Sequence, residues 1–186
     1  QGLQSHRYVL WIIDNASRDG SVDYVREEQR LDPHIQLVLN NRNRGYTAAI
    51  NQGLDQAGDA EYVLLLNPDV LIPPTTIPTL LQEMEKDAAI GVIAPQMRRR
   101  NGAVLSSCRR FPRSRDVFGE WLPHRLLHRL WPSYTDWKMS DFDHLTSRDV
   151  DQPQGACLLV RRSTLMQVGR LDERFFMFFS DVDFCR

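Results

Sequence analysis

The chain has 186 residues and a formal net charge of −1, with 42% hydrophobic and 25% charged residues. This is the composition of an ordinary globular protein and excludes a disordered, collagen-like or coiled-coil chain. The length predicts one domain, and the lack of a run of about 18 apolar residues predicts no membrane span. Three widely spaced cysteines, Cys108, Cys157 and Cys185, form neither a zinc pattern nor a disulfide framework, which favours a reducing compartment.

Short apolar runs alternate with helical patterns along the first half of the chain. Strands are predicted at residues 8–13, 35–40, 61–67, 90–97 and 156–162. Helices are predicted at 21–31, 45–57, 75–86 and 163–169. Ser21 is expected to cap the first helix, and Gly58 to end the second. The alternation predicts an α/β fold with a mostly parallel sheet flanked by helices.

Polar residues follow the first three predicted strands where each strand ends. The first strand ends in Asp14 and Asn15, the second in residues 40–45, and the third in residues 67–69. Ligands of open parallel sheets bind beyond the carboxyl ends of the strands. Each residue is open to a local explanation as a turn former or helix cap. Their occurrence at three successive ends nevertheless predicts a shared site.

Two groups of acidic residues are candidates for the chemistry of that site. Asp69 follows a buried strand, where a single carboxylate can hold Mg²⁺ or Mn²⁺ together with ligand phosphates. Asp181 and Asp183 follow an aromatic run, and desolvation there suits a general base. The alternative is that these two acids stabilise the start of a helix. No Walker-type or GxGxxG glycine pattern is present, which argues against P-loop and dinucleotide-binding proteins.

Positive charge is concentrated in residues 98–130, which hold nine arginines against Asp116 and Glu120. This segregation favours an anionic partner, with a solvated arginine-rich loop as the alternative. Within this stretch, residues 117–131 place leucines and Trp131 opposite Arg125 and Arg129 on a predicted helix. That pattern is typical of a helix in a membrane interface, with packing onto the protein itself as an equal alternative.

The ordered segments DNASRDGS, NRNRGYTAAINQG, LLLNPDV and GACLLVRRSTLMQVGRLDERFFMFFSDVDFCR resemble glycosyltransferase family 2, and most of all its bacterial rhamnosyltransferase-type members. The resemblance covers nearly the whole chain except residues 98–150. It implies a GT-A fold, a nucleoside-diphosphate-sugar donor, a divalent cation and inversion at the anomeric carbon.

The resemblance also implies roles for individual residues. Nucleotide-sugar binding falls to residues that match the strand-end and NxGxxxAxNxG patterns of the family: Asp14, Asn43, Gly45, Asn51, Asn67 and Asp69. Asp69 is in addition the expected ligand of the metal, Mn²⁺ or Mg²⁺. Asp181 matches the catalytic base. Asp172 and Arg174 are expected on the acceptor side, together with Gly155, whose lack of a side chain lets the backbone approach a ligand closely.

Two departures from the family pattern qualify these expectations. Ser180 stands where the family usually has Glu, so the base could have moved to another carboxylate such as Asp183 or Asp151. The family pattern also extends beyond both ends of this chain, so a fragment truncated at both ends is expected. Its parts are predicted as nucleotide-sugar binding in 1–97, a basic insertion in 98–150 and an acceptor and catalytic part in 151–186.

The predicted function is an inverting glycosyltransferase that uses a nucleoside-diphosphate sugar, with rhamnose as one option. The acceptor is expected to be a glycan or a lipid-linked glycan in cell-surface polysaccharide synthesis. A cytoplasmic location is predicted, with contact at the inner face of the membrane through residues 117–131, and no nucleic-acid partner. The alternatives are a non-catalytic nucleotide-sugar-binding module, a nucleotidyltransferase and, last, a nucleic-acid-binding protein.

Overall fold

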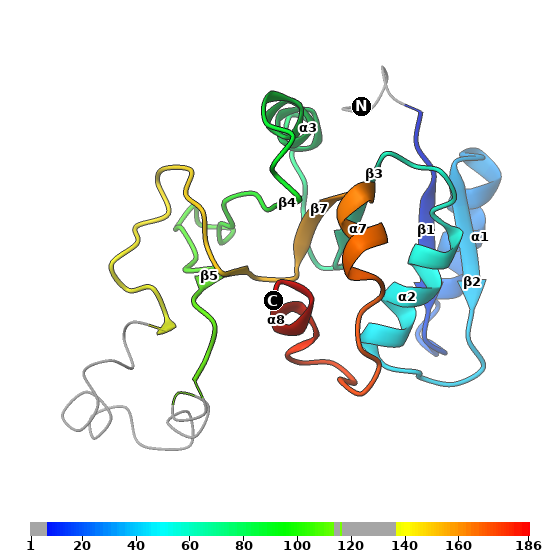
Figure 1. Cartoon of the computed structure of the whole chain (residues 1–186). Coiled ribbons are helices and arrows are strands. Elements are labelled where there is room, and N and C mark those ends of the chain that lie inside the picture. The colour runs from blue at the N-terminus through cyan, green and yellow to red at the C-terminus, as the bar shows by residue number, and fades with distance from the viewer. Residues whose placement is uncertain (1–6, 114–115, 117–136) are drawn as a thin grey trace.

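The computed structural model describes residues 7–113, 116 and 137–186 (Figure 1). Its helices are α1 (Ser21–Leu31), α2 (Tyr46–Gln56), α3 (Thr76–Lys86), α7 (Arg162–Val168) and α8 (Ser180–Phe184). Its strands are β1 (Leu10–Asp14), β2 (Ile35–Leu39), β3 (Tyr62–Leu66), β4 (Val92–Ile93), β5 (Cys108–Arg109), β6 (Gln152–Pro153) and β7 (Cys157–Arg161). The amphipathic helix predicted at 117–131 lies outside the described residues.

The first two strands form the parallel pair that the alternating pattern predicts. β1 and β2 pair in parallel from Leu10 opposite Ile35 to Asp14 opposite Leu39, and α1 connects them. The predicted cap of α1 is wrong by one residue. Gly20, with φ +86°, precedes the helix, while the Ser21 hydroxyl donates to Asp19 Oδ1 at 2.6 Å. A glycine at this position accepts the left-handed conformation without a Cβ penalty.

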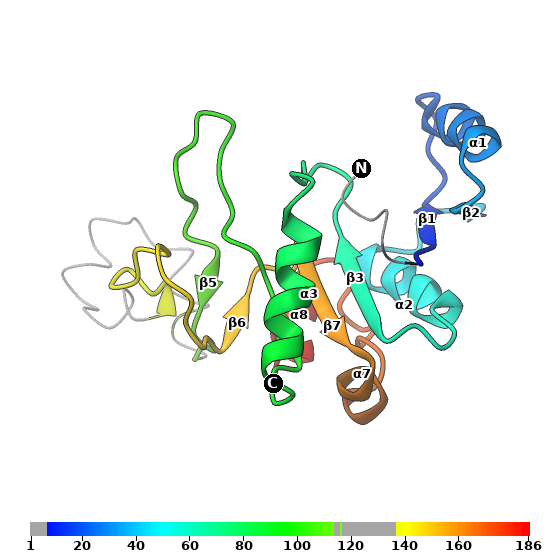
Figure 2. The same ribbon diagram turned by 90° about the horizontal axis from the view of Figure 1, so that it is seen from above.

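The last long strand enters the middle of a second sheet. β7 lies between β3 and β4 and runs antiparallel to both. Among the described strand pairs, direct parallel bonding is therefore limited to β1 and β2, while β3 and β4 are parallel to each other only across β7. Periodicity predicted each strand but not this pairing, because residues 98–150 separate β7 from β3 and β4 in the sequence. The α/β fold itself is confirmed (Figure 2).

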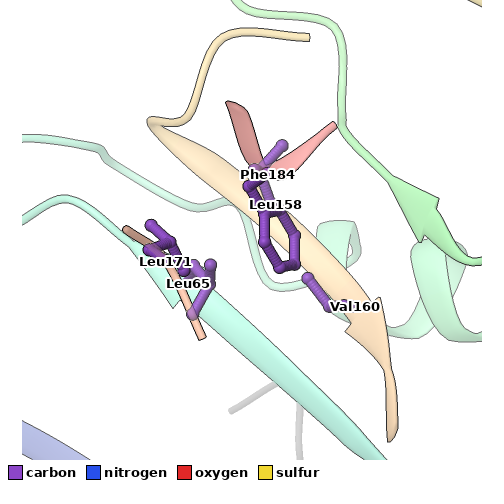
Figure 3. Close-up of a cluster of buried hydrophobic side chains, with 5 residues drawn as sticks. All are labelled: Leu65, Leu158, Val160, Leu171 and Phe184. Carbon is purple, nitrogen blue, oxygen red and sulfur yellow. The ribbon is translucent and has the colours of Figure 1, made fainter. Parts of the chain in front are cut away.

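β7 is apolar along its length because both of its faces are covered. On one face Leu158 and Val160 pack with Leu65, Leu171 and Phe184 of α8 (Figure 3). On the other face Leu159 packs with Leu80 and Met84 of α3. Burial of Phe184 fixes α8 against the sheet (Figure 3), and this contact sets the position of the acidic residues that begin the helix.

The described parts of the basic stretch form a less regular unit beside this core. β4 is shorter than predicted, since Pro95 of that run has no N–H to donate to a ladder. Pairing of β5 with β6 joins residues 108–109 to 152–153, two short strands that the sequence analysis missed. Buried His144 supports this pair, because its Nε2 accepts from Cys108 N–H at 3.3 Å.

Within the part of the chain that the structure describes, no helix combines the length and the apolar character that a bilayer crossing requires.

Candidate active site

The ends of β1 and β2 meet the loop before α2 through a small network of side-chain amides. Asn15 Nδ2 donates to the Gly45 carbonyl at 3.1 Å. Asn40 Nδ2 donates to Asn15 Oδ1 at 3.0 Å, and Asn40 and Gln52 exchange hydrogen bonds of 2.8 and 2.9 Å. The predicted convergence of these two strand ends is therefore present, and the amides hold the Gly45 loop against it.

Two of the residues predicted to bind the nucleotide sugar are hydrogen-bonded to neighbouring residues in this structure. The Asp14 carboxylate accepts from Ala16 N–H at 3.0 Å and from Ser17 N–H at 3.1 Å. Asn43 Oδ1 accepts from Gly45 N–H at 2.8 Å. Both side chains stabilise their own turns, which is a common use of Asp and Asn. Their predicted contacts with a nucleotide sugar stay predictions.

Gly45 occupies a position that no other residue fits. Its φ of +90° and ψ of 165° lie in a region that is essentially restricted to glycine. A Cβ built on Gly45 would lie 2.6 Å from Phe176 Cδ2 and 2.7 Å from the Phe176 carbonyl oxygen. This close approach lets Tyr46 N–H donate to the Phe176 carbonyl at 2.8 Å. Gly45 thus joins the start of α2 to the aromatic segment before α8.

We expect Gly45→Ala to destabilise the fold more than Gly20→Ala, because only the first adds a steric clash. Both glycines have positive φ, but a Cβ at Gly20 meets nothing within 4 Å. The backbone conformation alone costs about 1–3 kcal/mol, and overpacking adds about 1–3 kcal/mol at Gly45. Urea unfolding of the two variants measures the difference. Equal losses would mean that Phe176 does not pack against Gly45 in solution.

One face of α2 holds the segment that leads to α8. Asn51 is buried, with its amide nitrogen donating to the Leu171 carbonyl at 2.9 Å and its oxygen accepting from Leu171 N–H at 3.1 Å. The buried Thr47 hydroxyl donates to the Phe175 carbonyl. These residues are spaced i, i+4 and so share a face. In this structure Asn51 fixes a loop, and its predicted contact with the nucleotide sugar stays a prediction.

The turn after β3 carries the oxygen atoms predicted to hold a metal. Val70 N–H donates to the Asn67 carbonyl at 3.2 Å, which closes a turn with Pro68 and Asp69 at its centre. Asp69 is exposed. Asn67 Oδ1 is buried and has no hydrogen-bond partner. A buried acceptor without a donor is costly, and a cation would satisfy it.

This donor set fits a hard cation that takes most of its ligands from phosphate and water. No cluster of three or more His, Cys, Asp or Glu side chains able to hold a metal occurs among the described residues. A fully protein-bound metal is therefore a poor fit there, whereas one carboxylate and one amide oxygen suit a metal shared with a diphosphate.

The backbone at the start of β7 connects this turn to the predicted base. Asn67 N–H donates to the Ala156 carbonyl at 2.9 Å. The preceding residue, Gly155, donates its N–H to Asp181 Oδ2 at 3.1 Å. The other carboxylate oxygen, Oδ1, accepts from Val182 N–H at 3.0 Å. A Cβ at Gly155 would lie 3.0 Å from Asp181 Cβ, so the small residue permits this approach.

The surroundings of Asp181 distinguish it from its neighbours on α8. Burial, followed by the charge of Asp181, raises the pKa of Tyr46 to about 12 and that of Cys185 to about 11. Ser180 is almost completely buried, while Asp183 is exposed. Residue 180 therefore faces the interior, and Asp181 is the half-buried carboxylate of this helix that points to the start of β7.

The predicted acceptor-side pair lies on the surface of the loop before α8. Arg174 Nε donates to Asp172 Oδ2 at 2.7 Å, and Arg174 N–H donates to Asp172 Oδ1 at 2.9 Å. These bonds to Arg174 lower the pKa of Asp172. The Arg174 side chain is 88% exposed, so the guanidinium remains accessible to a ligand. Its predicted contact with an acceptor stays a prediction.

Sequence reasoning missed the residues that tie these parts together. Asn15 was considered only as part of a strand end, and the roles of Tyr46 and Thr47 were not predicted. A signal was present for Tyr46, because a large side chain with a polar tip directly follows a glycine at a helix start. The partner of its hydroxyl, the Gly155 carbonyl at 3.0 Å, is 109 positions away and could not be predicted.

The family of the chain follows from its comparison with known proteins. Residues 4–133 match the family model described as "Glycosyl transferase family 2", so the chain belongs to glycosyltransferase family 2. The members of this family are inverting glycosyltransferases with the GT-A fold, and the family and fold predicted from the sequence are confirmed.

Individual relatives agree with this assignment. The chain is 33% identical over 184 residues to the N-acetylglucosaminyl-diphospho-decaprenol L-rhamnosyltransferase of Mycobacterium tuberculosis, covering 92% of this chain and 58% of that protein. It is 24% identical over 180 residues to a low-salt glycan biosynthesis hexosyltransferase of Haloferax volcanii, covering 94% and 51%. The chain thus spans just over half the length of these curated relatives.

A solved structure shows the same fold. A mannosyltransferase of Pyrobaculum calidifontis, in complex with GDP-Man and Mn²⁺, superposes with a TM-score of 0.57 at 20% sequence identity. The match covers 94% of this chain and 40% of the mannosyltransferase.

Proposed function

We propose that the protein transfers a sugar, with rhamnose as the first choice, from a nucleoside-diphosphate sugar to a hydroxyl of a lipid-linked glycan, with inversion at the anomeric carbon. Asp181 acts as the general base and Asp69 helps to hold a divalent cation. The rhamnosyl and lipid-linked parts of the proposal are supported by the M. tuberculosis relative, whose name specifies both.

One observation carries this proposal. The backbone of Gly155 and Ala156 connects the Asn67–Asp69 turn with Asp181, through hydrogen bonds of 2.9 Å from Asn67 and 3.1 Å to Asp181. Residues far apart in the sequence are thereby placed at one end of β3 and β7. A carboxylate able to accept a proton and oxygens able to hold a cation are two groups that promote a single displacement on a nucleotide sugar.

The proposed step is a direct displacement. Asp181 accepts the proton of an acceptor hydroxyl while that oxygen attacks the anomeric carbon, and the bond from that carbon to the diphosphate breaks. Hydrogen bonds from Gly155 N–H and Val182 N–H hold the carboxylate before the reaction, so little reorganisation is needed. Burial of Phe184 in the core keeps α8, and with it Asp181, in place.

Asp69 and Asn67 Oδ1 are the groups that would hold the cation. When bound, a divalent cation neutralises negative charge on the diphosphate leaving group. Both residues belong to the turn from Asn67 to Val70 that follows β3, and Pro68 restricts its conformation. We propose Mn²⁺ or Mg²⁺ because the donors are oxygen atoms.

Two exposed groups of side chains are suited to an acceptor with apolar and anionic parts. A run of large apolar side chains is exposed directly before α8: Phe176, Met177, Phe178 and Phe179. Arg98, Arg99 and Arg100, in the basic stretch, are also exposed. The apolar chain of a lipid diphosphate would contact the exposed apolar side chains before α8. Its negatively charged diphosphate would contact the arginines. We propose a cytoplasmic protein that works at the inner face of the membrane.

The proposed division of labour follows the same geometry. Residues 1–97 would bind the nucleotide sugar, 98–150 would form the basic insertion, and 151–186 would supply the base and the acceptor side. The hydrogen bonds from Asn67 to Ala156 and from Tyr46 to Gly155 join the first and last of these parts, so we propose that they act as one catalytic domain.

A donor panel tests the proposal. The intact protein is heated with dTDP-, UDP- and GDP-sugars, with and without Mn²⁺, and its melting temperature is measured. We expect one nucleotide class to raise the melting temperature, and to do so only when Mn²⁺ is present, because ligands stabilise the folded state they bind. No shift with any nucleotide sugar would contradict the proposal, and a shift without any later turnover would favour the non-catalytic binding module.

A further inference from the structure

The half-buried side chain of Tyr46 reaches from the start of α2 to the segment before β7, whose Gly155 is hydrogen-bonded to the proposed base. Its hydroxyl donates to the Gly155 carbonyl at 3.0 Å. Its backbone N–H donates to the Phe176 carbonyl at 2.8 Å. Tyr46 therefore contacts two segments that lead to the surroundings of Asp181. One is the segment before β7, and the other is the segment before α8.

Gly155 needs such an external contact to hold its orientation. A glycine backbone is conformationally permissive, and a Cβ built on Gly155 would lie 3.0 Å from Asp181 Cβ, which is tighter than ordinary contact. The N–H of Gly155 donates to Asp181 Oδ2 at 3.1 Å. The direction of this N–H depends on the residues that fix the neighbouring backbone. Tyr46 holds the Gly155 carbonyl, Asn67 holds the Ala156 carbonyl, and on the other side the Ser107 carbonyl accepts from Gln154 N–H at 2.8 Å.

The Tyr46 hydroxyl is suited to this contact. Burial and the charge of Asp181 raise the pKa of Tyr46 to about 12, so the hydroxyl keeps its proton and donates throughout the physiological pH range. The Tyr46 hydroxyl donates to the Gly155 carbonyl and not to Asp181. The Asp181 carboxylate accepts from the N–H groups of Gly155 and Val182. The carboxylate remains free to accept a proton from an acceptor.

We propose that Tyr46 is a positioning residue for Asp181, and that it orients the carboxylate through the backbone of Gly155. This inference rests on the proposed function, in which Asp181 is the base. Tyr46 stabilises the orientation of the base and makes no contact with the reacting atoms. Its removal should therefore lower kcat and leave donor binding intact.

The test compares Tyr46→Phe with two reference variants in the intact protein, using dTDP-rhamnose as donor and N-acetylglucosaminyl-diphospho-prenol as acceptor. Tyr46→Phe deletes one hydroxyl and should lower kcat about tenfold, since a small misplacement of a catalytic group has effects of this size. The KM for the donor should change less than about twofold, as expected when ground-state binding is unaffected.

Tyr62→Phe is the matched control. Its hydroxyl accepts from Arg161 Nη1 at 3.2 Å, and it lies at the other end of β3 from Asn67. This variant also loses one half-buried tyrosine hydrogen bond but should keep the wild-type kcat. A similar loss of kcat in both variants would show that Tyr46 has only a structural role.

The decisive measurement is the residual turnover of the double variant, in which Tyr46→Phe is combined with Asp181→Asn. If Tyr46 acts through Asp181, the second substitution should have little further effect on the residual turnover, because residues that act as a unit are not additive. A full additional tenfold loss would overturn the inference. Asp181→Asn with wild-type turnover would contradict the proposed function itself, whereas inactive Asp181→Asn together with fully active Tyr46→Phe would contradict only the inference about Tyr46.

Discussion

Asp181→Asn should lower turnover about a hundredfold or more while donor affinity stays within about twofold. The substitution keeps the size of the side chain, and the amide oxygen can still accept from Gly155 N–H, the present partner of Oδ2 at 3.1 Å. What is lost is the hydrogen bond from Val182 N–H to the other oxygen and, under the proposal, the ability to take up the acceptor proton. Turnover is measured as release of nucleoside diphosphate, and donor affinity by calorimetric titration.

Two nearby carboxylates are the controls for this assignment. Asp183→Asn alters an exposed residue of the same helix, and Asp151→Asn alters an exposed residue whose Oδ2 accepts from Phe111 N–H at 3.0 Å. Both variants should retain most of the activity. If either one is inactive and Asp181→Asn is active, the base has moved to that residue, as the serine at position 180 allows.

Asp69→Ala should abolish the Mn²⁺ dependence of donor binding and leave the fold intact. Asp69 is exposed at the centre of a turn, so its removal sacrifices little packing. In the proposed site, this substitution removes the charged group and leaves Asn67 Oδ1 as the side-chain oxygen of the turn that could contact a cation. A metal shared with a diphosphate depends on its few protein carboxylates. Calorimetric titration of the donor, with Mn²⁺ and with EDTA, measures the effect.

Asp59→Ala is the matched control, since Asp59 is also an exposed aspartate of a loop on the same domain. It should bind the donor with unchanged Mn²⁺ dependence and melt at the same temperature as Asp69→Ala. A wild-type Mn²⁺ response in Asp69→Ala would remove Asp69 from the proposed metal site.

The elements of the fold were largely predictable because each has a local signal. The apolar run ending at Asp14 became β1, and the Gly45–Gly58 interval became α2 with Gly58 in the left-handed conformation after its end. Pairing was not predictable in the same way. The antiparallel insertion of β7 between β3 and β4 depends on pairs such as Leu64 with Leu159 and Ile93 with Leu159, which are far apart in the sequence. Periodicity carries no signal for such pairs.

Sequence reasoning selected candidate groups for the site but could not predict their connections. Asp69 and Asp181 were proposed from a strand end, an aromatic run and the family resemblance, and their roles stay predictions. The sequence could not show that Asp14 and Asn51 have partners within the protein. It also could not show that Tyr46 reaches Gly155. Such contacts depend on how the loops fold over one another, and they decide which polar groups remain available to a ligand.

The stereochemistry of transfer tests the central proposal most directly. The intact protein is incubated with dTDP-rhamnose of known anomeric configuration, N-acetylglucosaminyl-diphospho-prenol and Mn²⁺, and the product is examined by NMR through its anomeric carbon–hydrogen coupling. A single displacement at a site built on Asp181 and Asp69 predicts a glycosylated product with inverted configuration, formed only in the presence of the metal. A product with retained configuration, or formation of the product at the same rate in EDTA, would contradict the account.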